Sequence, residues 1–186
     1  MAKSTDYLPS QAEVDNVLYC KKQVDFTGVR WGEKPPPNKP FLWLQMSLLP
    51  TDSDGIPIQG LSVLIQWKPD HEPKREGDPV YPKINIVAFY NKKRVFAVDT
   101  YPFDGHTNRY RIDHPDFKEY VLGAHYHIYY EEAGHYSGVG FPIKSNIKPD
   151  DLLGYWNFFC EKLNITCIGK LPLPLENDSG QIGLPL

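Results

Sequence analysis

The sequence has few cysteines, no long hydrophobic run and no excess of positive charge. Its three cysteines, Cys20, Cys160 and Cys167, form no Cys-x-x-Cys pair, so neither a disulfide framework nor a zinc ribbon is indicated. No apolar stretch approaches the roughly 18 residues of a membrane-spanning helix. The opening segment MAKSTDYLPSQAEVD lacks the apolar core of a signal peptide. We therefore expect a cytoplasmic protein without a membrane span.

A basic surface field is also absent. Lys and Arg together number 20 against 23 Asp and Glu, which gives a net charge of −3. This balance excludes the global positive field that drives non-specific nucleic-acid binding and leaves only a local basic patch. The 186 residues are 41% hydrophobic and 13% aromatic, as in globular proteins. We expect a single domain over residues 1–186 with a real core.

The order of the patterns predicts an α+β fold, with an antiparallel sheet of about five to six strands between an N-terminal and a C-terminal helix. Ser10 and Glu13 form a capping-box pattern at the start of a helix over roughly 10–23. Apolar, β-branched and aromatic runs predict strands over 41–49, 58–67, 84–91, 94–101, 121–131 and 139–143. The short link 91–93 predicts a hairpin.

The second helix is predicted from a first-turn proline, Pro149, and the two acids that follow it. Its apolar stripe consists of Leu152, Trp156, Phe159 and Leu163, joined by Leu153 and Cys160. The stripe is expected to face the core. Cys160 is therefore expected to be a small buried hydrophobic residue and not a nucleophile.

Proline marks two segments outside these elements. The stretch GEKPPPNKP at 32–40 cannot form a helix or a central strand, because proline fixes φ and donates no hydrogen bond. It is expected to be an extended connector. The tail at 171–186 is also interrupted by prolines, and we expect an arm that lies on the domain or on a partner.

Histidines are concentrated in the stretch GAHYHIYYEE, residues 123–132. Strand side chains alternate between faces, so one face is expected to carry His125, His127, Tyr129 and Glu131. Two histidines at this spacing lie roughly 6–7 Å apart on a strand. His106 stands in a second pattern, DGHTN at 104–108, among turn-forming residues just after a strand end, where functional residues are often placed.

Three interpretations of the histidine strand stay open. The first is a metal site, with a third ligand from His106, Asp104, Asp99 or Glu131. The second is acid–base catalysis of metal-free RNA cleavage, with a cation from Arg94, Arg109, Arg111 or Lys92. The third is a half-exposed strand face whose polarity has no function. Residue types alone do not separate the three.

The motifs from Val95 to Ile143 resemble those of a bacterial family, domain-of-unknown-function family 6978. Members carry an Arg-x-Asp strand end, a His-x-Asn turn, a His-x-His strand with Glu, and an aromatic-Pro-aliphatic strand. The corresponding residues here are Ala97 to Asp99, His106 to Asn108, His125 to Ile128, Tyr129, Glu131, and Phe141 to Ile143. Ala97 replaces the arginine of the family. More distantly, the pattern is similar to TumE-type toxins, which are regarded as ribonucleases of toxin–antitoxin modules.

The resemblance implies that His106 lies beside the His-x-His strand. With the acid–base interpretation, this gives a first hypothesis, a bacterial toxin or defence effector that cleaves RNA without a metal or another cofactor. His125 and His127 would act as base and acid, and His106 would support or replace one of them. The remaining roles are orientation of an imidazole by Tyr129 and Glu131, fixation of the loop by Asp99, and substrate contact by Arg94 and Arg109.

Two alternatives belong to other functional classes. One is a non-catalytic component that binds a protein partner, such as an immunity protein, an inhibitor or a defence-complex subunit. Under either of the first two hypotheses the partner would be an antitoxin or another complex subunit, with RNA as a further ligand of the effector. The other alternative is a metal-dependent hydrolase with His106, His125 and His127 as ligands.

Overall fold

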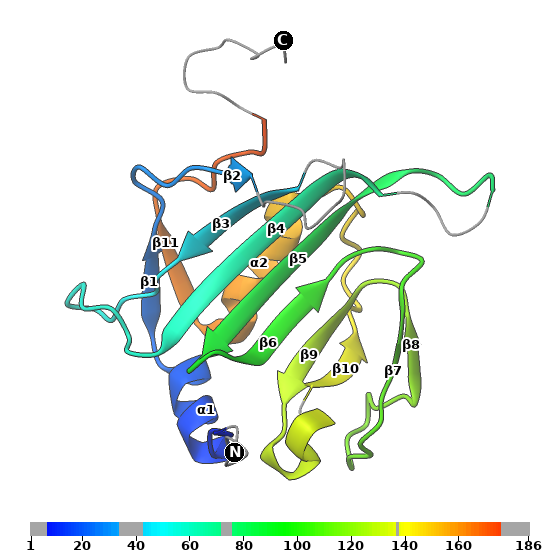
Figure 1. Ribbon diagram of the computed structural model, residues 1–186, viewed down its shortest axis with the longest axis horizontal. Coiled ribbons are helices and arrows are strands. Elements are labelled where there is room, and N and C mark those ends of the chain that lie inside the picture. The colour runs from blue at the N-terminus through cyan, green and yellow to red at the C-terminus, as the bar shows by residue number, and fades with distance from the viewer. Residues whose placement is uncertain (1–6, 34–42, 72–75, 137, 176–186) are drawn as a thin grey trace, which may run out of the picture.

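A computed structural model of the protein describes residues 7–33, 43–71, 76–136 and 138–175. Two α-helices and a large antiparallel sheet confirm the predicted α+β class (Figure 1). Residues 34–40 of the expected connector and 176–186 of the expected arm lie outside the described residues. Within the described ranges, no helix is both long and apolar enough to cross a membrane.

The large sheet has seven strands in the order β10-β9-β6-β5-β4-β3-β2. These strands are β2 (Gly32–Glu33), β3 (Leu44–Leu48), β4 (Leu61–His71), β5 (Tyr81–Tyr90), β6 (Lys93–Asp99), β9 (His125–Tyr129) and β10 (Gly138–Pro142). The turn between β5 and β6 has positive φ at Asn91 (48°) and Lys92 (67°). This conformation is that of a two-residue type I′ hairpin and confirms the predicted hairpin.

Two further strand pairs flank this sheet. A parallel pair joins β1 (Lys22–Asp25) to β11 (Ile165–Ile168), and an antiparallel hairpin joins β7 (Gly105–Thr107) to β8 (Tyr120–Leu122). None of β1, β7 and β11 was predicted from the sequence, because each is only three or four residues long. The single strand predicted over 121–131 is divided at Gly123, which has a φ of 88°, into β8 and β9. A 3₁₀ segment, η1 (Glu131–Tyr136), follows β9.

The first helix, α1 (Gln11–Tyr19), begins with the predicted capping box. Ser10 is the N-cap, and its side chain and that of Glu13 bond each other's backbone N–H groups. The helix ends before the predicted residue 23, because Lys22 already belongs to β1. The buried ammonium of Lys22 donates to the carbonyls of Leu18 and Leu163, one in α1 and one in α2 (Leu152–Leu163). This single side chain therefore ties the C-terminal ends of both helices together.

Helix α2 confirms the predicted apolar stripe in most positions. Its buried residues are Leu152, Tyr155, Trp156, Phe159, Cys160 and Leu163. Leu153 is 51% exposed, so its assignment to the stripe was wrong. Pro149 lies before the N-cap Asp151 and not in the first turn, since the Asp151 carboxylate already accepts from Gly154 N there.

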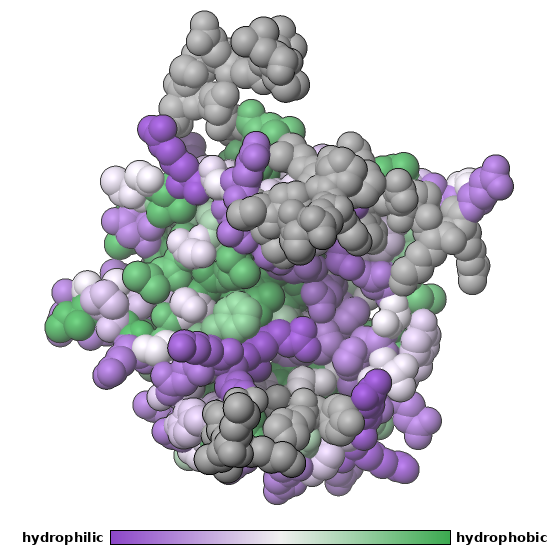
Figure 2. Space-filling model, in the orientation of Figure 1, coloured by the Kyte–Doolittle hydropathy of each residue, from purple (hydrophilic) through white to green (hydrophobic). Residues whose placement is uncertain are grey.

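The two faces of the sheet have different roles. Helix α2 lies behind β4 and β5 (Figure 1), and the ring of Phe159 meets that of Phe96 edge-on at 5.5 Å. On the opposite face hydrophobic side chains gather over β3, β4 and β5 (Figure 2); they include the partly buried Leu64, Val87 and Phe89. Toward β9 the same face becomes polar and carries the histidines.

Candidate functional site

The register of β6 against β9 brings an aspartate and two histidines together. Asp99 pairs with His125, and Ala97 pairs with His127, across the antiparallel ladder. Alternation then places Asp99, His125 and His127 on the face opposite α2. The Oδ2 atom of Asp99 lies 3.0 Å from Nε2 of His127 and 3.8 Å from Nε2 of His125.

The β7–β8 hairpin adds the third histidine. His106 lies on the short strand β7, so its expected position on a loop after a strand end was wrong. Its ring centroid is 4.4 Å from that of His127 and 5.6 Å from that of His125, and the last two rings are 4.8 Å apart. One ring nitrogen from each histidine lies within 4.8 Å of the other two. The structure thus gathers all three candidate histidines into one cluster.

Asn108 fixes the position of His106. Its Oδ1 atom accepts from the backbone N of Gly140 at 2.7 Å and lies 3.0 Å from Nε2 of His106. Its Nδ2 atom donates to the carbonyls of Gly140 and Lys118. Because these four contacts determine the amide orientation, Oδ1 is an acceptor and Nε2 of His106 must carry the proton.

The tautomers of the other two histidines follow in the same way. Nδ1 of His125 lies 2.6 Å from the carbonyl oxygen of Gly123, which can only accept, so Nδ1 donates. Nε2 of His127 donates to the carboxylate of Asp99. A neutral imidazole then keeps its lone pair on Nδ1 of His106, Nε2 of His125 and Nδ1 of His127. The last of these atoms is buried and has no hydrogen-bond partner among the described residues.

Burial keeps two of the rings neutral. Burial, aided by the charges of His127 and His125, lowers the pKa of His106 to about 4. Burial also lowers the pKa of His127, against the opposing effect of Asp99. His125 and His127 are only 4% and 3% exposed, whereas His106 is partly exposed. Neutral imidazoles are the form that binds metal ions.

Asp99 is held in its ionised form. Burial opposes ionisation, but the hydrogen bond from His127 and the charges of the histidines and Arg94 together lower the pKa of the carboxyl group. With its amide oriented to satisfy its neighbours, Asn85 donates to Oδ1 of Asp99 at 3.1 Å. Both carboxylate oxygens therefore have donors. Asp99 contacts His127, whereas the sequence hypothesis expected Asp99 to fix the loop.

Arg94 borders the cluster, because its positive charge contributes to lowering the pKa of Asp99, His106 and His127. A Cβ atom built on Gly138 would lie 3.1 Å from Nη2 of Arg94 and 3.6 Å from Nδ1 of His127. The two side chains thus approach the same point beside β10, and the Arg94 residue is exposed. Arg109 is exposed and follows Asn108 in the chain, beyond β7.

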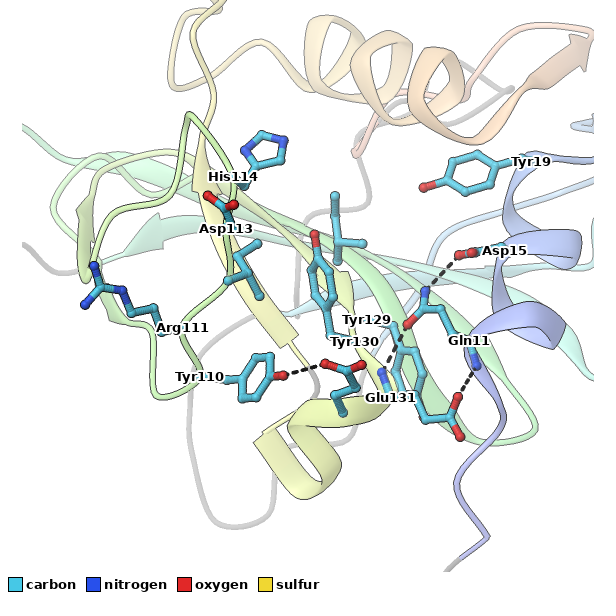
Figure 3. A pocket seen from close by; sticks show the side chains of 13 residues that line it. Gln11, Asp15, Tyr19, Tyr110, Arg111, Asp113, His114, Tyr129, Tyr130 and Glu131 are labelled. Atoms are coloured by element: carbon cyan, nitrogen blue, oxygen red, sulfur yellow. Dashed lines mark hydrogen bonds between the residues drawn. The ribbon is translucent and has the colours of Figure 1, made fainter.

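Tyr129 and Glu131 make other contacts than those expected of them. The Tyr129 hydroxyl donates to the carbonyl of Pro9, and the Glu131 carboxylate accepts from the backbone N of Gln11. Both residues line a hollow of about 750 Å³ between α1, β9 and the segment around Tyr110 (Figure 3). Their hydrogen bonds thus attach β9 and η1 to the N-terminal segment and do not orient an imidazole.

Three residues of the site were not identified from the sequence in the roles they have. Asn108 was noted only as part of the His-x-Asn motif, whereas it bonds Gly140 on β10. Asn85 and Gly140 gave no signal, because their roles depend on pairings across the sheet. The His-x-Asn motif was the one available clue to Asn108.

Gly140 is expected to be essential for the position of His106. A Cβ atom there would lie 2.6 Å from Cδ2 of His106, which is closer than real Cβ atoms approach. We expect Gly140→Ala to lower the free energy of unfolding by about 1–3 kcal/mol through overpacking, measured by urea denaturation. Gly138→Ala is the matched control, since the closest contact of its Cβ atom would be Nη2 at the flexible end of Arg94, at 3.1 Å. Equal stability losses in both variants would contradict this role.

Comparison of the chain with protein-family models, with curated proteins and with solved structures finds no match. The resemblance to family 6978 and to TumE-type toxins therefore stays a prediction from motif order. Function has to be inferred from the geometry of the site.

Proposed function

We propose that the protein is a metal-dependent hydrolase whose divalent ion is bound by His106, His125 and His127. The observation that carries the proposal is the clustering of three imidazoles with one nitrogen each within 4.8 Å of the others. Three protein ligands with a remaining open position are typical of catalytic zinc-type sites.

The surroundings of the three rings support this proposal. Metal-binding histidines usually donate their other N–H to a carboxylate, an amide or a backbone carbonyl, which fixes the tautomer. Here the acceptors are Asp99, Asn108 and Gly123, one for each ring. The buried, unpartnered Nδ1 of His127 also needs a partner, because a buried polar atom without one is costly. A bound cation would satisfy it.

The nature of the donors favours a borderline transition metal over magnesium or calcium. All three donors are imidazole nitrogens, which suit Zn²⁺ and neighbouring ions, whereas Mg²⁺ and Ca²⁺ prefer oxygen. Such an ion would supply a water molecule whose pKa is lowered to about 7. The chain's own contribution is to orient the rings through the three acceptors and to leave Arg94 on the exposed side.

The position of Arg94 favours an anionic substrate, such as a phosphate ester. The guanidinium group is a fixed positive charge suited to phosphate and carboxylate, and the residue is exposed beside β10. The Asp99 side chain is 25% exposed and His106 is also partly exposed, so the cluster is open at these two residues. Substrate would approach from this side and not through the core.

The test is hydrolysis of bis-p-nitrophenyl phosphate by the full chain, with chelator and after addition of Zn²⁺, Mn²⁺ or Co²⁺. We expect turnover only with added metal. Arg94→Gln should raise KM with unchanged metal content, whereas Arg111→Gln, an exposed arginine of the hollow in Figure 3, should change neither. Turnover that is insensitive to the chelator would contradict the proposal.

A second candidate is the metal-free RNA cleavage of a toxin or defence effector. The supporting observation is the Asp99–His127 hydrogen bond, since a carboxylate commonly orients a catalytic imidazole. The burial of His125 and His127 favours the metal proposal, because an RNA phosphodiester must reach both rings. Cleavage of a single-stranded RNA in chelator, with a 2′-deoxy analogue left intact, would instead support this candidate. Metal binding without any turnover would favour the non-catalytic partner-binding alternative.

A further inference from the structure

Two of the cysteines lie together at the other end of the molecule. Cys160 is on α2 and Cys167 is on β11, and the left-handed residue Asn164 (φ 53°) reverses the chain between them. Their sulfur atoms are 3.8 Å apart. The prediction that Cys160 is buried is confirmed, at 8% exposed, but its thiol contacts a second thiol that the sequence spacing did not indicate.

The two thiols have different surroundings. Cys167 is exposed, and its sulfur accepts a hydrogen bond from the indole Nε1 of Trp156 at 3.3 Å. Hydrogen bonds from Cys160 and Trp156 lower the pKa of the Cys167 thiol despite partial burial. The hydrogen bond to Cys167 and burial raise the pKa of Cys160. An exposed thiolate next to a buried, protonated thiol matches an attacking cysteine beside a resolving one.

A groove of about 780 Å³ opens beside Cys167. Among the residues that the structure describes, its lining includes two basic ones, Arg30 and Lys170, and no aspartate or glutamate. Apolar residues such as Phe26, Leu153 and Leu171 form much of the remaining wall. The groove therefore suits a small molecule with carboxylate groups and a partly apolar body, held next to the Cys167 sulfur.

We propose that Cys167 and Cys160 form a redox-active dithiol that reacts with a small anionic disulfide bound in this groove. The Cys167 thiolate attacks one sulfur of the disulfide, which forms a mixed disulfide and releases one small thiolate. Cys160 then gives its proton to the first released thiolate, through solvent, and attacks the Cys167 sulfur; this releases the second small thiolate, which takes a proton from water. The protein dithiol is oxidised to one disulfide, and the small disulfide is reduced to two thiols.

The geometry permits the second step with a small movement. A disulfide bond is about 2.05 Å long, so the two sulfurs need only close a gap that starts from 3.8 Å. Trp156 and Cys160 lie one turn apart on α2, which keeps the indole N–H and the resolving thiol on the same side of Cys167. None of these contacts involves the histidine cluster, and the inference does not rest on the proposed hydrolase.

The experiment treats the full, reduced chain with oxidised glutathione and follows the products by intact mass and peptide mapping. We expect the wild type to form the Cys160–Cys167 disulfide. Cys160→Ser should stop at a glutathione adduct on Cys167, and Cys167→Ser should react at neither position. Cys20→Ser removes the remaining cysteine and should behave as the wild type, since the Cys20 thiol donates to the backbone carbonyl of Val17 at the end of α1.

Two results would overturn the inference. One is an adduct in Cys160→Ser that forms on Cys20 as fast as on Cys167, which would show no activation at this site. The other is a wild type that accumulates the Cys167 adduct without the internal disulfide. Circular dichroism of each variant separates either result from simple misfolding, and Lys170→Gln should slow the reaction with oxidised glutathione more than that with an uncharged disulfide.

Discussion

Replacement of His106 by alanine is expected to lower the affinity for Zn²⁺ by more than about 100-fold. Loss of outer partners of metal ligands already costs about 10- to 100-fold, and removal of one of three ligands should cost more. His106 is also the best ligand to remove, because it is partly exposed on β7 whereas His125 and His127 are almost completely buried. Competition with a chromophoric chelator measures the affinity of the folded protein directly.

His114→Ala is the matched control for that change. His114 is exposed, and its ring lies against Phe141 on the other side of β10. Its Nδ1 atom accepts from the backbone of Asp116 and contacts none of the clustered histidines. The control should bind Zn²⁺ as the wild type does. Equal affinities of both variants would contradict the assignment of His106 as a ligand.

Phe159→Ala is expected to cause the largest loss of stability. The ring is fully buried and packs edge-on against Phe96 at 5.5 Å and stacked on Trp156 at 5.5 Å. Truncation of such a ring leaves a cavity and costs about 3–5 kcal/mol. For a domain of this size the melting temperature should fall by about 6–20 °C, as measured by calorimetry or thermal circular dichroism.

Phe158→Ala is the neighbouring control, with the same change of residue on the same helix. Phe158 is only partly buried and contacts Tyr126 and Lys162 at the side of α2. It should lose clearly less stability than Phe159→Ala. If the two variants were equally destabilised, α2 would not pack on the sheet through the face described.

The sequence predicted the parts of the fold that depend on local patterns. The capping box at Ser10, the α2 stripe and the β5–β6 turn follow from short-range chemistry, and the structure confirms them. The strands that were missed, such as β7 and β11, are short and exist through pairing with distant segments. Local propensity carries little information about such pairs.

The candidate site was predictable to a similar extent. Alternation along β9 correctly placed His125 and His127 on one face, where His106 joins them and Asp99 bonds His127. The roles expected of Tyr129 and Glu131 were wrong, because their polar atoms form hydrogen bonds with Pro9 and Gln11 of the N-terminal segment. Contacts between residues more than a hundred positions apart are outside the reach of strand periodicity.

The most direct measurement of the central claim is X-ray absorption of the zinc-loaded full chain. The expected first shell contains about three imidazole nitrogens with one or more light oxygen ligands, as in other three-histidine sites. Loss of one imidazole in His106→Ala would complete the assignment. A first shell dominated by sulfur would place the ion at Cys160 and Cys167, and failure to retain stoichiometric metal would leave the histidine cluster without its proposed ion; either result would contradict the metal-dependent hydrolase.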